Sequence, residues 1–226
     1  MILDRLLRLA HADPYGDIGA YRTDERLAKL QSPRYVVAKL KAVAYELRHP
    51  DHPWITAHAV SWLDANVRPY HTAFEWGSGA STPWLARRVR RLVSVEHHKE
   101  WHDRVQVKLA RAGVDNVDYR LVPESQYASA IDEFPDGHFD LILVDGLFRD
   151  ATLERAIPKI AVGGWLILDN ANWYLRSASP TPHSRPLGAA SYSDVMERVE
   201  KALSTWRCIW TSNGINDTVI MNKPAS

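Results

Sequence analysis

The stretch TAFEWGSGAST, residues 72–82, decides the predicted fold. Its first five residues are mostly apolar, which is typical of a strand buried on both faces of a sheet. Gly77 and Gly79 follow this strand and allow the backbone to pass close to a ligand. The helix expected after them begins with free backbone N–H groups, which suit a polar or anionic ligand. Strand, glycine turn and helix therefore predict the first unit of an α/β sheet.

Short apolar runs alternate with helical stretches after this unit. The further runs are RLVSVE (91–96), VDYRLV (117–122), DLILVD (140–145) and GGWLILDN (163–170). The helices expected between and after them cover residues 84–91, 99–112, 127–133, 153–160 and 192–203. The chain then ends in RCIWTS (207–212), the turn NGIND and TVIMNK (218–223), which predict a hairpin. We expect an α/β fold, a Rossmann-like, doubly wound, seven-stranded sheet with a C-terminal antiparallel hairpin and an N-terminal helical extension.

Two regions outside this sheet have patterns of their own. Residues 1–70 predict the N-terminal helical extension, and residues 71–226 the sheet domain. In the extension, apolar residues from Val36 to Leu47 recur with the spacing of one buried helix face. Thr56 is expected to cap a second helix over residues 57–66. The stretch 174–191 is rich in Ser, Pro and Gly and has no apolar period, so we expect a mobile lid there.

Composition narrows the class of protein. The chain has 226 residues, of which 46% are hydrophobic and 24% charged, the balance of a globular domain. Its net charge of +1 supplies no overall attraction to nucleic acid or to an anionic membrane, so we expect a small-molecule partner. Cys208 is the only cysteine, which excludes an internal disulfide and fits a reducing compartment. Because no apolar run of about eighteen residues and no signal-peptide core are found, we expect a cytoplasmic protein.

Polar residues follow each predicted strand at its carboxyl end, where sheets of this kind bind ligands. Glu96 ends the second strand, nineteen residues after Gly77. A carboxylate at this place accepts hydrogen bonds from a ribose diol, although it also suits a helix N-terminus. Ser125 and Gln126 follow the third strand, where they either reach an adenine edge or, at Ser125, cap a helix. His97 is expected beside the adenine.

Two acids and an amide end the fourth and fifth strands. Asp145 follows the fourth strand, and Asp169 and Asn170 follow the fifth. Because a strand exit needs only a turn former, these side chains point to a function. They suit a hard cation such as Mg²⁺, which prefers oxygen ligands. Hydrogen bonding, or a role for Asp145 as general base, are the alternatives.

The sequence from Phe74 to Asn172 resembles class I S-adenosylmethionine-dependent methyltransferases. The motifs that carry the resemblance are, in order, E-x-G-x-G, VSVE, ESQ, DLILVDG and GGWLILDN. The last three look most like those of the catechol and caffeoyl-coenzyme A O-methyltransferases. An acid two residues before the first glycine, here Glu75, commonly helps hold the amino-acid end of the cofactor in such proteins. The expected cofactor-binding residues are Glu75, Trp76, Gly77, Gly79, Ser81, Glu96, His97, Ser125, Gln126 and Asp145.

The resemblance also implies a metal centre. In the catechol type, a strand-end Asp and an Asp-Asn pair bind magnesium, which makes Asp145, Asp169 and Asn170 the candidate ligands here. Asp145 and Asp169 are also the candidate catalytic residues. The proton-accepting lysine of that type, three residues after the strand-end Asp, is replaced by Phe148, and the neighbouring Arg149 stays protonated. The E-W-G-S-G-x-S-T form and the SVEHH segment are more similar to a bacterial methyltransferase group with unassigned substrates.

The sequence therefore predicts an enzyme that transfers a methyl group from S-adenosylmethionine to an oxygen or nitrogen of a small molecule. Mg²⁺ is the candidate second cofactor. A nicotinamide-dependent oxidoreductase is the alternative enzyme, which Thr82 in place of a third glycine disfavours. A catalytically retired binding module is the remaining hypothesis, which the acids and glycines at the strand ends disfavour. A homo-oligomer through the N-terminal helices stays open.

Overall fold

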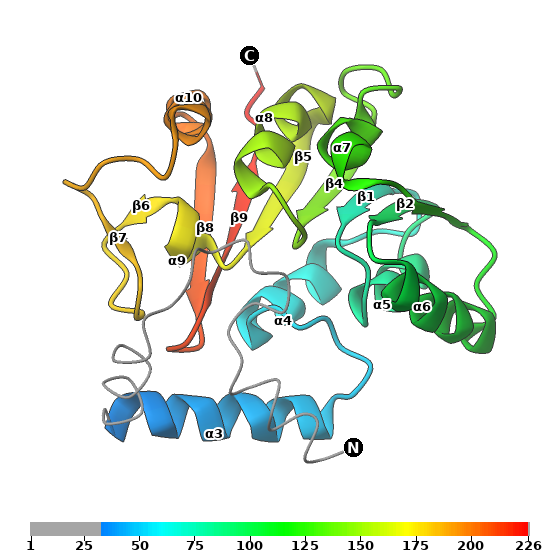
Figure 1. Cartoon of the computed structure of the whole chain (residues 1–226), viewed down its shortest axis with the longest axis horizontal. Helices are drawn as coiled ribbons and strands as arrows, with labels where there is room; N and C mark the ends of the chain where they lie inside the picture. Colours follow the sequence, from blue (N-terminus) through cyan, green and yellow to red (C-terminus); the bar gives the residue numbers. More distant parts are fainter. Residues whose placement is uncertain (1–32, 226) are drawn as a thin grey trace.

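The computed structural model describes residues 33–225, and seven strands of this region form one sheet. Their order is β3-β2-β1-β4-β5-β9-β8, in which β1 to β5 are parallel and β9 and β8 antiparallel (Figure 1). The strands are β1 (Thr72–Trp76), β2 (Arg91–Glu96), β3 (Val117–Leu121), β4 (Phe139–Val144), β5 (Ile160–Asp169), β8 (Arg207–Ser212) and β9 (Asp217–Asn222). The predicted α/β fold and its terminal hairpin are confirmed.

Helices cover both faces of the sheet, because side chains alternate along each strand. On one face Phe74, Ile142 and Leu166 pack against helices α8 and α10. On the other face Ala73 and Leu141 pack against α4 and α5. The helices on the two faces are α4 (Ala57–Asn66), α5 (Ser81–Ala86), α6 (Lys99–Ala112), α7 (Glu124–Tyr127), the 3₁₀ turn η1 (Ala128–Ile131), α8 (Arg149–Lys159) and α10 (Asp194–Leu203).

Several helices begin earlier than the sequence predicts. Helix α8 begins at Arg149 rather than at residue 153, directly after Phe148, which has the left-handed φ of 50°. The N-terminus of α8 has no side-chain cap, so the usual polar start signal is missing from the sequence. Helix α6 matches its predicted range, and Gly113 ends it at φ 63°.

The N-terminal extension divides into two differently packed helices. Thr56 caps α4 as predicted, through its side-chain oxygen and the N–H of Ala59. In contrast, α3 (Pro33–Arg48) contains no buried residue, and Leu40 is 64% exposed. The expected buried face of this helix is therefore wrong for the described part of the chain. The reason is its position, since α3 lies below the sheet layers rather than against them (Figure 1).

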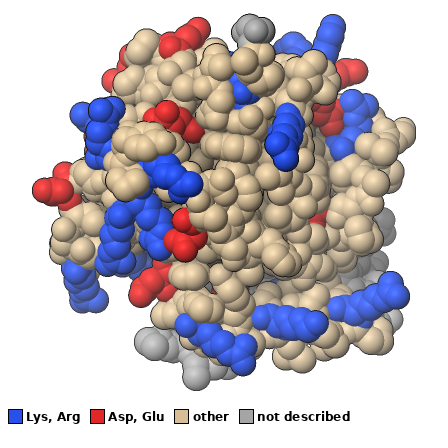
Figure 2. Space-filling view, turned by 180° about the vertical axis from the view of Figure 1, so that it is seen from behind, with Lys and Arg blue, Asp and Glu red and all other residues tan. Residues whose placement is uncertain are grey.

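Charges of both signs are interspersed over the surface seen in Figure 2, except for a row of Lys and Arg side chains at the foot of the molecule, where α3 lies. This helix carries Arg34, Lys39, Lys41 and Arg48 against a single acid, Glu46.

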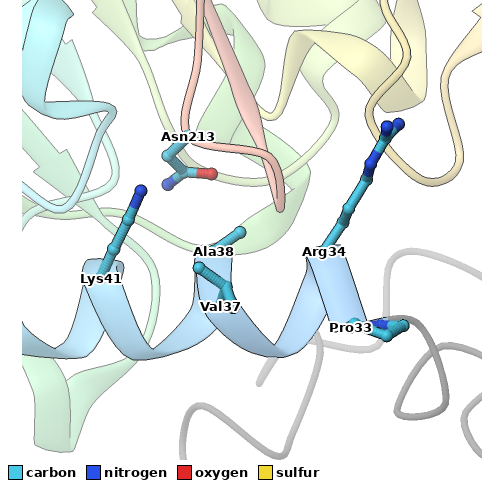
Figure 3. Close-up of a pocket in the computed structure, with 6 residues that line it drawn as sticks. All are labelled: Pro33, Arg34, Val37, Ala38, Lys41 and Asn213. Carbon is cyan, nitrogen blue, oxygen red and sulfur yellow. The ribbon is translucent and has the colours of Figure 1, made fainter.

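A hollow of about 400 Å³ is lined by residues of α3 and by Asn213 of the turn between β8 and β9. Figure 3 shows Val37 and Ala38 facing Asn213 of that turn, with Arg34 and Lys41 at the two ends. A Cβ atom on Gly214 would lie 3.0 Å from the Cβ of Ala38, so helix and turn approach closely.

The stretch expected to be a lid holds regular structure. After α9 (Ala171–Tyr174), strands β6 (Arg176–Ser177) and β7 (Arg185–Pro186) form a small parallel pair. Thr181 donates to Asp217 Oδ1 at 2.5 Å, and Arg185 donates to the carbonyl of Trp173 at 2.9 Å. Polar contacts thus hold this stretch, whose sequence lacks the apolar period of a buried element. Mobility of the stretch stays a prediction.

None of the helices within residues 33–225 is long and apolar enough to cross a membrane.

Candidate functional site

The glycine loop after β1 lies across the carboxyl ends of the neighbouring strands. Gly77 has φ 87°, and its N–H donates to the carbonyl of Val95 in β2. A Cβ atom on Gly77 would lie 2.5 Å from the carbonyl oxygen of Asp145, which follows β4. A Cβ atom on Gly79 would meet only Ser81 Oγ, at 3.9 Å. Gly77 is therefore required by packing, whereas Gly79 leaves space at the loop.

Glu75 is connected to this loop by hydrogen bonds through Thr82. Its carboxylate is fully buried, and Oε2 accepts hydrogen bonds from Thr82 Oγ1 and Ser94 Oγ, both at 2.7 Å. Thr82 Oγ1 in turn accepts from the N–H of Gly79, which connects the carboxylate to the loop. Burial raises the pKa of Glu75, and hydrogen bonds from Ser81, Ser94 and Thr82 oppose this shift. Direct contact of Glu75 or Ser81 with a cofactor stays a prediction, because both side chains are buried here.

Trp76 lies in the core rather than at the loop surface. Its ring is fully buried, and the centroids of the Trp76 and Phe74 rings are 4.5 Å apart. The indole N–H donates to the backbone carbonyl of Tyr127 at 2.9 Å. Trp76 is among the expected cofactor-binding residues, but its side chain is enclosed in the core and does not face a ligand. The sequence position was ambiguous, because the last residue of a buried strand can face either the core or the ligand.

Glu96 is fastened to the glycine loop. Its Oε2 accepts from Ser78 Oγ at 3.0 Å, and its Oε1 accepts from the N–H groups of His97 and His98 at 2.9 Å. Ser78 is held further by Tyr119, whose hydroxyl lies 2.7 Å from Ser78 Oγ. The Glu96 side chain is only 2% exposed, so its orientation is fixed. The glycine loop after β1 and the acid that ends β2 are therefore in direct contact.

The residues expected near an adenine lie at the same edge. His97 Nδ1 is 3.1 Å from Glu96 Oε1, and its ring is edge-on to Tyr127 with centroids 5.5 Å apart. Ser125 and Gln126 are exposed in α7. The N-cap of α7 is Pro123, so the alternative role of Ser125 as helix cap is wrong.

Asp145, Asp169 and Asn170 come together around one side chain, Arg149. The guanidinium donates from Nη2 to Asp145 Oδ1 at 3.0 Å and from Nη1 to Asn170 Oδ1 at 2.6 Å. Nη1 also donates to the backbone carbonyl of Asp169 at 2.7 Å, and Nε to that of Gly146 at 3.1 Å. Sequence reasoning considered Arg149 only as a base and missed this role. The signal was its position only four residues after Asp145, at the end of the short loop between β4 and α8.

The two acids of this cluster have perturbed ionisation. Burial and the neighbouring Asp169 raise the pKa of Asp145 well above its ordinary value, and Arg149 opposes the shift. Burial also raises the pKa of Asp169, against Arg149 and a 2.6 Å hydrogen bond from Thr218 Oγ1 to Asp169 Oδ1. The Asp145 side chain is 25% exposed, whereas Asp169 is buried. Asp145 is therefore the better placed of the two to meet a ligand.

The described region offers few side chains that could together bind a metal ion. Within residues 33–225, no three His, Cys, Asp or Glu side chains are grouped so that they could hold a metal ion. At the candidate centre, the oxygens of Asp145 and Asn170 already face a guanidinium. An additional divalent ion would meet like-charge repulsion there. The residues as arranged do not fit Mg²⁺.

A larger hollow of about 700 Å³ lies at the opposite end of the parallel strands. Thr72 at the start of β1, Arg91 at the start of β2 and Phe139 at the start of β4 line it. None of the sequence-predicted site residues lines this hollow, so we place the functional site at the carboxyl ends.

Comparisons with known proteins agree with this geometry. Residues 74–171 match the family model described as "Methyltransferase domain". No curated protein matches the sequence. Cofactor-bound Rv0187 from MTB is similar in structure, with 20% identity, a TM-score of 0.54, and coverage of 95% of this chain and 100% of that one.

Two further solved structures share the fold at low identity. The O-methyltransferase TomG from Streptomyces achromogenes, involved in tomaymycin synthesis and solved in complex with SAM, is 19% identical with a TM-score of 0.55. The alignment covers 91% of this chain and all of TomG. An rRNA methylase from Streptococcus thermophilus is 12% identical with a TM-score of 0.52, over 73% of this chain and 93% of that one. At these identities the likeness concerns the fold alone.

Proposed function

We propose that this enzyme, which carries a methyltransferase domain over residues 74–171, transfers a methyl group from S-adenosylmethionine to an oxygen or nitrogen of a small molecule. The contact between Ser78 Oγ and Glu96 Oε2 carries the proposal. It fixes a carboxylate beside a glycine loop at the carboxyl ends of adjacent parallel strands. This combination is suited to hold the ribose and the amino-acid end of one nucleoside-type ligand.

Different residues around this contact would bind different parts of the cofactor. Glu96 would accept the ribose hydroxyls, since a carboxylate oxygen has lone pairs beyond the hydrogen bonds it already accepts. The backbone at Gly79 would lie against the amino-acid end, where a side chain would fill the space. Ser125, Gln126 and His97 would contact the adenine.

S-adenosylmethionine supplies an electrophilic methyl group on a positively charged sulfur. The protein must therefore orient the acceptor atom in line with that methyl and remove the proton of the acceptor. Asp145 is our candidate base. Arg149 holds its Oδ1, and no residue of the described chain donates to its Oδ2. Oδ2 of Asp145 would take up the proton that the acceptor atom loses on methylation. The raised pKa makes the ionised Asp145 a stronger proton acceptor.

A small-molecule acceptor is favoured over a nucleic acid by charge. The net charge is +1, and the face in Figure 2 mixes acids and bases above the row at α3. A nucleic-acid enzyme of this size needs a continuous basic surface near its site. The fold itself occurs in both an O-methyltransferase and an rRNA methylase, so it does not decide between them.

Ligand-induced stabilisation separates the candidate functions. A ligand that binds only the folded chain raises its Tm in proportion to the logarithm of its concentration. We expect S-adenosylmethionine and its demethylated product to raise Tm, and NADH to leave it unchanged. Stabilisation by NADH alone would support an oxidoreductase. Stabilisation by S-adenosylmethionine, without methyl transfer to any member of a broad panel of hydroxylated and amino compounds, would support a retired binding module.

A further inference from the structure

The candidate metal centre already contains a positive charge that belongs to the chain. Two of the three side chains predicted to bind Mg²⁺, Asp145 and Asn170, direct their Oδ1 atoms at the guanidinium of Arg149, at 3.0 and 2.6 Å. The third, Asp169, directs Oδ1 at Thr218 and gives only its backbone carbonyl to the guanidinium. The Oδ1 atom of each expected ligand therefore already accepts a hydrogen bond from the chain.

The local backbone is arranged around the same cation. Arg149 begins α8, and Phe148 before it has φ 50°, while Asn170 has φ 52°. Non-glycine residues seldom adopt such angles, and here they stand on either side of the guanidinium contacts. The guanidinium carbon also lies 5.5 Å from the centre of the Tyr174 ring. Arg149 is 8% exposed, so it is enclosed by these partners rather than reaching into solvent.

We propose that Arg149 is a built-in replacement for the divalent cation, which makes this methyltransferase site independent of metal. The guanidinium balances the charge of Asp145 and fixes the exits of β4 and β5, tasks that an ion bound to the same oxygens would perform. Arginine suits this place because it remains protonated and its planar fork matches several oxygens at once. Arg149 is thus a positioning residue that acts through Asp145. The inference refines the proposed function, on which it rests for the reaction but not for the metal.

Mn²⁺ binding tests the proposal without any cofactor or acceptor. Mn²⁺ prefers the same oxygen ligands as Mg²⁺ and is detected directly by electron paramagnetic resonance. We expect no bound Mn²⁺ in the wild-type chain. In Arg149→Ala, the freed oxygens should bind roughly one Mn²⁺ per chain, and Mn²⁺ should raise the Tm of this variant only. Adding Asp145→Asn to Arg149→Ala should abolish the gain. Arg155→Ala, on the exposed side of the same helix, is the matched control and should bind none.

The results that would overturn the proposal are equally direct. Mn²⁺ binding by the wild-type chain that is lost in Asp145→Asn would show a metal site despite Arg149. Absence of Mn²⁺ binding in a folded Arg149→Ala would show that the guanidinium does not stand in for an ion. Arg149→Gln takes its place if Arg149→Ala fails to fold both with and without Mn²⁺, and the same two outcomes apply. Arg149→Lys, which keeps the charge, should bind no Mn²⁺ and should keep the wild-type Tm more closely than Arg149→Ala.

A parallel measurement keeps this test separate from that of the proposed function. Binding of the demethylated cofactor to the wild-type chain should be unchanged by a chelator. If that cofactor does not bind at all, the proposed function fails while the Mn²⁺ result still decides the role of Arg149.

Discussion

At the scale of single residues, the two loop glycines have different reasons to be glycine. Gly77→Ala would place a methyl group 2.5 Å from the Asp145 carbonyl at a φ of 87°, so we expect a less stable chain with a clearly lower Tm. Gly79→Leu meets no such contact, so its Tm should stay near the wild-type value, while cofactor binding is lost because the side chain fills ligand space. Thermal melts and calorimetry on both variants check this. Equal Tm losses in the two would contradict it.

Glu75 should make the stability fall as pH rises. Because burial raises its folded-state pKa, the folded chain binds the proton more tightly than the unfolded chain. The free energy of unfolding should therefore decrease from about pH 4.3, the unfolded pKa, up to the raised folded pKa, by at most about 1.4 kcal/mol per pH unit for this group. Urea unfolding of Glu75→Gln across pH 5–8 should show a flatter profile than the wild-type chain. Glu100→Gln, exposed in α6, should keep the wild-type slope.

Residue roles were predictable where spacing and strand ends decide them. That Glu96 lies beside the glycine loop could be found from the sequence, because neighbouring strand exits lie close together. The core position of Trp76 could not, because its orientation depends on which side of the turn faces the ligand. The expectation of a metal drew attention away from Arg149, although its position four residues after Asp145 is visible in the sequence.

At the scale of elements, one buried hydrogen bond helps to anchor the segment 174–191. Thr181 Oγ1 donates to Asp217, which is buried and also accepts from the indole N–H of Trp210. Thr181→Val should leave Asp217 with fewer partners and cost about 1–3 kcal/mol of stability. We expect faster proteolysis within the segment and reduced turnover, with cofactor affinity unchanged. Leu187→Ala, at an exposed position of the same segment, is the control. Unchanged cleavage in Thr181→Val would contradict this anchoring role.

Strands were easier to predict than helix starts. Strands β1, β2 and β4 are short, largely apolar runs, and burial on both faces leaves little choice of structure, whereas the edge strand β3 is only partly buried. Helix α8 begins shortly after a strand exit without a side-chain cap, so the polar cap that usually marks a helix start is missing. The stretch that contains β6 and β7 is held in part by the contact of Thr181 with Asp217, which is distant in sequence, so no local pattern reveals it.

At the scale of the whole molecule, the two described helices before residue 70, α3 and α4, are packed differently. Leu63 of α4 is 1% exposed in the core shared with the sheet, whereas Leu40 of α3 is 64% exposed. Leu63→Ala should lower the free energy of unfolding by about 2–5 kcal/mol. Leu40→Ala should change it by no more than about 0.5 kcal/mol. Urea unfolding of the two variants compares them directly. A large cost for Leu40→Ala would place α3 in the folding unit.

The affinity of the chain for the demethylated cofactor tests the central claim most directly. Calorimetry on the wild-type chain and on Glu96→Ala should show that the variant binds more weakly by about 1.5–3 kcal/mol, because a charged acceptor for the ribose hydroxyls is lost. Glu100→Ala, an exposed acid on the neighbouring helix, should bind like the wild-type chain. Wild-type affinity in a correctly folded Glu96→Ala, or no binding by the wild-type chain itself, would contradict the cofactor site described here.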